Sequence, residues 1–156
     1  MYYVIDKDAL YALVDEEVSH AADAAYSEDG RSLFDSVALT EKDRPIVDRL
    51  MDDAVSAFVR REFDITKFSP ESYADEFGEA QLTGRMRLQF YVPDFDETMT
   101  DALTDELGRY IVLFTCAGIF QQRRAALVPE YTARAQAAMD KAVALLKTRK
   151  HPVTQW

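Results

Sequence analysis

The residues with the best spacing for chemistry are Glu17 and His20, which stand three apart in a segment with a helical pattern. A Glu-x-x-His pair projects from one helix face, and two facing pairs hold the metal ions of carboxylate-bridged helical bundles. The second pair is missing, because His151, the other histidine, has Thr148 at that spacing. We therefore expect a solvated helix end at Glu17 and His20 and predict no metal-ligating residue.

An acidic stretch that begins at residue 94 offers a second arrangement of possible metal ligands. Four oxygen-bearing side chains stand at positions one, three, five and twelve of a calcium-binding loop, namely Asp94, Asp96, Thr98 and Asp105. Met99, however, stands where that loop needs a glycine. Acidic side chains also stabilise the N-terminus of a helix, so the stretch predicts a helix start instead of a calcium site.

The sequence does not place its residues in a pattern for nucleophilic catalysis or for nucleotide binding. Cys116 lies inside the apolar run 110–120, where a thiol stays protonated and unreactive. The five glycines are scattered, so neither a phosphate-binding loop nor a dinucleotide fingerprint occurs. The sequence thus predicts no catalytic residue, no cofactor-binding residue and no enzymatic activity.

The composition indicates one folded domain over residues 1–156. Apolar residues make up 48% and charged residues 29%, which is ordinary for a globular protein. A net charge of -10, from 28 acids and 18 bases, argues against non-specific binding to nucleic acid or to anionic lipid. The one basic cluster, Lys147, Arg149 and Lys150, is expected to lie at a helix C-terminus, where cations are stabilised.

The cysteine count and the apolar segments bear on the compartment of the protein. The single cysteine excludes an intramolecular disulfide and fits a reducing compartment. The first residues have neither a basic region nor a long apolar region of a signal peptide. The run 110–120 falls well short of the ~20 apolar residues that a membrane-spanning helix needs. We expect a core helix there and no membrane association.

Apolar residues at spacings of three and four predict four helices. The predicted ranges are about 7–26, 40–63, 94–126 and 129–151. The first ends in a turn at 27–31, where Gly30 suits a positive φ. The second starts either at Thr40, whose capping box includes Asp43, or nearer Asp43, since Pro45 costs less close to a helix start. Pro129 suits the first turn of the fourth helix, and Pro152 stops it.

Between the second and third helices lies a β excursion at about 64–93. Residues 85–92 alternate between apolar and polar side chains, which predicts a half-buried strand. Its partner is either upstream, at 63–68 or 73–77, or on another copy of the chain, because an unpaired strand edge invites association.

These elements predict a mainly α fold, a bundle of about four helices with a short β-strand or hairpin insertion. A helix that is apolar all round, as at 110–120, must be enclosed by other helices. Sister subunits can supply part of that enclosure. The small side chains at Cys116, Ala117 and Gly118 allow a neighbouring helix to approach closely.

The order of four segments carries a family resemblance: SLFDSVALTEKDRPIVDRLMDDAVSAF, then LQFYVPDFDE, then ELGRYIVLFTCAGIF, and last PEYTARAQAAMDKAVALLKTRKHP. In this order the chain resembles the head-to-tail connector (adaptor, or neck) proteins of tailed bacteriophages and prophages. The likeness spans most of residues 30–152 and leaves residues 1–26 outside it. It rests on segment order and character, and it carries over no site residue.

The resemblance implies a helical structural protein without a cofactor, a small-molecule substrate or enzymatic activity. Such proteins assemble as homo-oligomeric rings between the portal and the tail, so the implied partners are sister subunits, portal proteins and tail proteins. The implied location is the bacterial cytoplasm during assembly and then the virion. An acidic subunit would suit a channel through which DNA slides, because it repels phosphates and gives no specific nucleic-acid binding.

Two alternatives stay open from the sequence. A helical-bundle metal-binding protein or enzyme is motivated by Glu17 and His20 and by the acid-rich helix ends. A bacterial adaptor or regulator unrelated to phage would have the same physical features.

Overall fold

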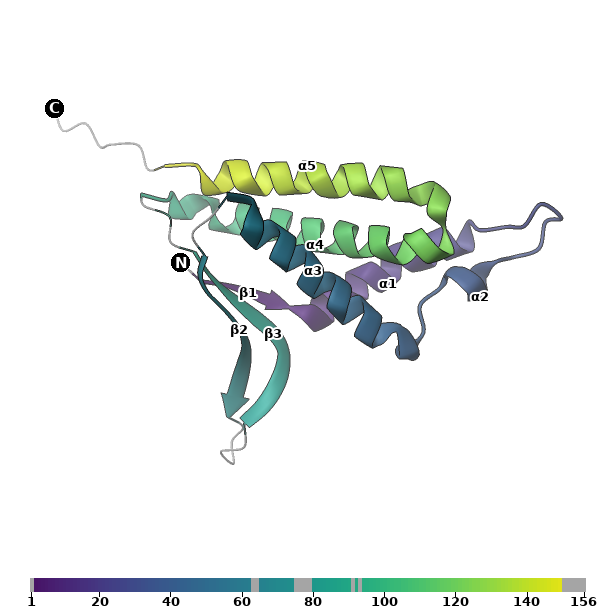
Figure 1. The fold of residues 1–156 in the computed structure, drawn as a ribbon, viewed down its shortest axis with the longest axis horizontal. Helices are drawn as coiled ribbons and strands as arrows, with labels where there is room; N and C mark the ends of the chain where they lie inside the picture. Colours follow the sequence, from purple (N-terminus) through teal and green to yellow (C-terminus); the bar gives the residue numbers. More distant parts are fainter. Residues whose placement is uncertain (1, 63–64, 75–79, 91, 93, 150–156) are drawn as a thin grey trace.

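The computed structural model describes residues 2–62, 65–74, 80–90, 92 and 94–149, and side chains at 5–61, 92 and 94–149. Within them the fold is mainly α, as predicted, with a three-stranded sheet (Figure 1). The helices are α1 (Lys7–Asp23), α2 (Phe34–Val37), α3 (Arg44–Glu62), α4 (Thr100–Arg123) and α5 (Val128–Leu146). Single 3-10 turns precede or follow them at η1 (Glu41–Asp43), η2 (Glu97–Met99) and η3 (Ala125–Leu127).

Helix α4 is the centre of the helical body. Helix α5 packs antiparallel along it, while α3 and α1 cross it (Figure 1). Residues 110–120 of α4 are buried except for Phe114 and Gly118, which are half-buried. The expectation that neighbouring helices enclose this apolar run is therefore confirmed. Enclosure by a sister subunit stays a prediction.

Gly118 permits the close approach of α3 to α4. A Cβ atom added at Gly118 would stand 2.7 Å from Cδ2 of Leu50 and 3.0 Å from its Cδ1. Carbon atoms do not normally come this close, so the Leu50 side chain occupies the space that a larger residue would need. The prediction that small residues admit a neighbouring helix holds at this position.

Polar caps define the helix starts. The Asp6 carboxylate accepts hydrogen bonds from the backbone N–H groups of Asp8 and Ala9, at 3.1 and 3.2 Å, and so caps α1. At Thr40, the backbone N–H donates to the Asp43 carboxylate at 2.8 Å, which completes the predicted capping box. This cap opens η1, and α3 itself begins only at Arg44.

Three predicted helix ends were too late. Helix α1 ends at Asp23 rather than residue 26, because Tyr26 pairs with Ser32 to close a turn in which Gly30 has a φ of 80°. Helix α4 ends at Arg123 rather than residue 126, because Arg124 adopts an extended φ of -154° before η3. Pro152, the predicted stop of the last helix, lies outside the described residues, and α5 already ends at Leu146.

The sheet consists of β1 (Tyr2–Asp6), β2 (Ile65–Ala74) and β3 (Ala80–Phe90), in the order β1-β3-β2 and antiparallel throughout. Residues 85–90 of the predicted strand 85–92 are thus the second half of a longer strand, while Val92 is not in a strand and Tyr91 lies outside the described residues. The upstream partner of β3 is β2, as one alternative expected, and β1 pairs on its other edge. The alternation of side chains along 85–91 falls on residues whose side chains lie outside the described set.

The hairpin of β2 and β3 projects from the helical body as an arm (Figure 1). Strand β1 pairs with residues 85–89 of β3 and no further. The outer part of the arm, with Ser72 opposite Leu82 and Ala74 opposite Ala80, is therefore a two-stranded ribbon. None of the helices in the described residues is both long enough and apolar enough to span a membrane.

Candidate interaction surfaces

The Glu17 and His20 pair is not brought together. The His20 side chain is 75% exposed, and its nearest carboxylate is that of Glu16, 3.9 Å from Nε2. Glu17 instead accepts a 2.8 Å hydrogen bond from the hydroxyl of Tyr131 on α5. Among the described residues, no three His, Cys, Asp or Glu side chains are grouped so that they could hold a metal ion. Glu17 thus joins α1 to α5.

The acidic stretch at residue 94 forms a helix start. The Asp96 carboxylate accepts from the backbone N–H of Thr98 at 3.0 Å and from its hydroxyl at 2.7 Å, and so caps η2. Asp105 lies within α4, beyond this turn, and is exposed. A calcium-binding loop would need both carboxylates around one ion. Asp96 thus caps the turn η2 and Asp105 lies within the helix α4, as expected for acids at a helix start.

Cys116 is buried, as predicted, with no exposed surface. Burial raises the pKa of its thiol to about 12, and the nearby charge of Glu17 adds to the effect. A thiol that remains protonated at neutral pH is a poor nucleophile. The side chain therefore has the properties of a small core residue.

Two of the grooves along α4 lie between α4, α5 and a third helix. The first has a volume of about 630 Å³ and lies between α3, α4 and α5, with a mixed lining of apolar residues such as Phe114 and Met139 and polar ones such as Gln121 and Gln136. Arg61 in its lining pairs with Asp140 at 2.7 Å.

The second groove, of about 520 Å³, lies between α1, α4 and α5. Its lining includes Glu17, which binds Tyr131, and Arg134, whose guanidinium stands 5.0 Å from the centre of the Tyr131 ring. Glu17 links α1 to α5 through Tyr131, whereas Arg134 and Tyr131 both lie on α5.

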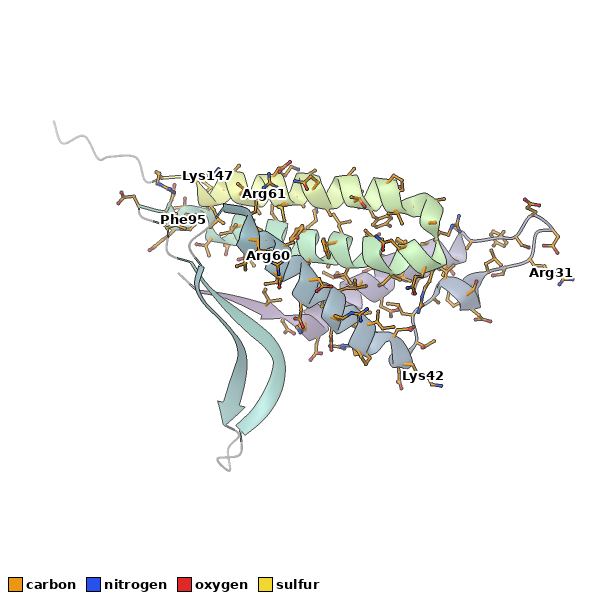
Figure 2. The ribbon with its side chains drawn as sticks, viewed as in Figure 1. Arg31, Lys42, Arg60, Arg61, Phe95 and Lys147 are labelled. Carbon is orange, nitrogen blue, oxygen red and sulfur yellow. The ribbon has the colours of Figure 1, made fainter. Side chains whose placement is uncertain are left out.

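The basic cluster near residue 147 lies at the end of α5, as expected. The Arg149 guanidinium donates a 3.0 Å hydrogen bond to the carbonyl of Leu146, one of the last carbonyls of the helix. Lys147 is exposed at this end (Figure 2). Lys150 lies outside the described residues.

The loop between α1 and α2 exposes large apolar side chains that the sequence analysis did not single out. Tyr26 is 63% exposed, Leu33 39% and Phe34 37%, three of the five large hydrophobic residues exposed in the described part of the chain. We call these three residues the end patch. The pairing of Tyr26 with Ser32 brings the two halves of the loop together. The only sequence signal was an aromatic residue on each side of a turn.

The segment that contains the end patch is acidic. The segment 23–41 contains a single base, Arg31, which lies 3.5 Å from Asp29. Its five acids are all exposed: Asp23, Glu28, Asp29, Asp35 and Glu41. This end of the molecule thus combines apolar surface with negative charge.

The remaining feature is the arm of β2 and β3, whose outer part pairs only strand to strand among the residues that the structure describes. Among the described residues, β3 contacts β1 and α1 at its base, and β2 packs mainly against β3. Comparison with protein-family models, with curated proteins and with solved structures gives no match to this chain.

Proposed function

We propose that this chain is a head-to-tail connector subunit of a tailed phage or prophage, and that it acts through self-association and partner binding without catalysing a reaction. The observation that carries the proposal is the arm. A subunit that acts by assembly needs a surface that is incomplete in the isolated chain, and the arm provides one.

The outer part of the arm has two open strand edges. In an antiparallel ribbon of two strands, each strand leaves half of its N–H and C=O groups without a strand partner. An isolated two-stranded hairpin is only marginally stable in water. A further strand or a flat surface of a neighbouring subunit would bind these groups, which is the usual way in which exposed sheet edges recognise a partner.

The charge of the chain supports the same proposal. A net charge of -10 disfavours adhesion to DNA, and a connector lines a passage through which DNA must slide. Three ionisable side chains were candidates for chemistry. Glu17 links two helices, His20 is exposed, and Cys116 is a thiol in the core. They give the metal-binding or enzymatic alternative no support.

The test compares the full chain with a variant in which Asn-Gly replaces residues 72–82, which shortens the arm but keeps the part paired with β1. We expect the full chain to form rings, alone or with a portal or tail protein, as seen by light scattering and electron microscopy. The shortened variant should keep its helical circular dichroism and lose assembly. A full chain that stays monomeric in every mixture would overturn the proposal.

A further inference from the structure

We propose that the outer edge of β1 pairs antiparallel with β1 of a second copy of this chain, with Val4 opposite Val4 of that copy. Among the strands that the structure describes, none pairs with this edge, and β1 packs mainly against β3. The inference goes beyond the proposed function, because it concerns an edge of the sheet that is not part of the arm.

The two outer edges of the sheet differ in their sequence and regularity. Strand β2 contains Pro70, and its pairing shifts between Ile65 and Lys67 and again between Pro70 and Ser72. Proline, lysine and bulges are the features that keep a further strand from pairing with an edge. Strand β1, YYVID, contains no proline, glycine or lysine, and its five pairs with β3 run without a shift. The edge of β1 therefore lacks the protection that β2 has.

Strand β1 is held in place before any partner arrives. Its five residues pair with β3 along one edge. Ile5 is only 1% exposed and belongs to the core, and the Asp6 carboxylate caps α1 through the backbone N–H groups of Asp8 and Ala9. A strand that is already ordered loses little conformational freedom when another strand binds to it. The outer edge is thus a preformed template.

A second copy of β1 is the partner strand that the sheet itself offers. Residues 86–89 of β3 are paired on both sides, the outer half of β3 belongs to the arm, and the edge of β2 is protected. Outside the arm, β1 is therefore the one described strand with an unprotected edge. Two identical strands related by a two-fold axis present the same edge to each other.

The hydrogen-bond pattern selects the register. Along an edge strand, the N–H and C=O groups of alternate residues point outward, so two opposite residues of an antiparallel pair must both point outward or both inward. A two-fold axis between identical strands can therefore pass through a residue but not between two residues. An axis at Val4, the middle residue, pairs all five residues of β1. Any other axis leaves at least two of them unpaired.

The residue pairs in this register are compatible. Tyr3 lies opposite Ile5 of the second copy, and aromatic residues opposite β-branched ones stabilise antiparallel sheets. Asp6 lies opposite Tyr2, so the two acids do not face each other. An isologous contact of this kind closes on two copies. It makes a dimer and is distinct from the contact of arms that the proposed function requires.

Disulfide cross-linking tests the register. Val4→Cys should cross-link two copies in oxidised glutathione, because opposite Cα atoms lie about 4.5 to 5.5 Å apart, within the range of a disulfide. The matched control is Tyr2→Cys, whose two copies would lie about 14 Å apart, four residues along the strand. We expect Val4→Cys to cross-link at least about tenfold faster than Tyr2→Cys. Cys116 is buried, so the unchanged chain should not cross-link.

A charge pair at the two-fold axis tests the contact without a covalent bond. The unchanged chain should show a reversible monomer–dimer equilibrium in analytical ultracentrifugation. Val4→Lys and Val4→Glu should each weaken dimerisation about fivefold, because each places like charges opposite each other. An equimolar mixture of the two variants should restore it, which damage to the fold would not do. Circular dichroism checks that each variant keeps its helices.

Three results would overturn the inference. They are an unchanged chain that is monomeric at every concentration, equal cross-linking of Val4→Cys and Tyr2→Cys, and cross-linking of Val4→Cys to a portal or tail protein in preference to itself. The arm-shortened variant separates the inference from the proposed function. With Val4→Cys added, that variant should form no rings and should still cross-link in pairs.

Discussion

Replacement of Gly118 by alanine tests directly how the apolar helix α4 is enclosed. The added Cβ would stand 2.7, 3.0 and 3.4 Å from Cδ2, Cδ1 and Cγ of Leu50. Because both methyl groups and the branching carbon are close, rotation of the methyl groups alone cannot relieve the contact. The whole Leu50 side chain, or the α3 backbone, must move.

Two opposing terms determine the change in stability. Alanine is favoured over glycine within a helix by about 1 kcal/mol. An extra carbon in a tightly packed contact costs about 1 to 3 kcal/mol. Since Leu50 is half-buried and lines a groove, we place the cost near the middle of that range and expect Gly118→Ala to destabilise the chain by about 1 kcal/mol.

The assay is a double-mutant cycle with Leu50→Ala, followed by urea unfolding and circular dichroism. Once the Leu50 side chain is removed, only the helix preference remains, and Gly118→Ala should stabilise the chain by about 1 kcal/mol. The sign of the effect should therefore reverse between the two backgrounds. If Gly118→Ala stabilises the unchanged chain as much as the Leu50→Ala variant, the packing argument is refuted.

Three further predictions concern titration and access. The pKa of Asp43 is lowered, first by the backbone N–H of Thr40 and then by the guanidinium of Arg123. The stabilising contribution of this carboxylate is therefore present above about pH 4 and is lost as pH falls through the lowered pKa. Acid unfolding of Asp43→Asn should lack this contribution, and a pH profile equal to that of the unchanged chain would contradict the prediction. Burial raises the pKa of Tyr110 to about 12, so stability should decline as pH rises from about 10 to 12, and urea titrations of Tyr110→Phe should show a smaller decline. Cys116 should react with an aromatic disulfide reagent only as fast as the chain unfolds, and rapid labelling of the native chain would contradict its burial.

The helices could be predicted from the sequence because burial imposes a period on them. Apolar residues at spacings of three and four predicted α1, α3, α4 and α5, and the run 110–120 identified the central helix. The boundaries were less accurate because turns decide them. The ends at Asp23 and Arg123 depend on a bridge at Tyr26 and on one extended residue, which no period records.

The sheet was only half predictable. The alternation at 85–92 revealed one strand, whereas β1 (Tyr2–Asp6) is too short to show a clear period and gains its stability from pairing with residues 85–89 of β3. The YYVID sequence does contain the aromatic and β-branched residues that favour strands. Pairing between distant segments is a property of the folded chain, so local patterns do not specify it.

The candidate surfaces were harder to predict than the core. Scattered exposed apolar residues are normal, and the pairing of Tyr26 with Ser32 that joins the two sides of the loop leaves no trace in a local period. The expected solvated helix end is found at His20, which is exposed, but not at Glu17, which is half-buried and accepts a hydrogen bond from Tyr131 of α5.

Hydrogen exchange of the arm tests the central claim most directly. Backbone amides at 72–74 and 80–82 would be compared between the dilute chain and the chain assembled alone or with a portal or tail protein, with amides at 110–120 as the internal reference. We predict that assembly slows exchange at the arm and leaves the reference unchanged. Equal exchange rates at the arm in both states would contradict the proposal that the chain acts through this surface.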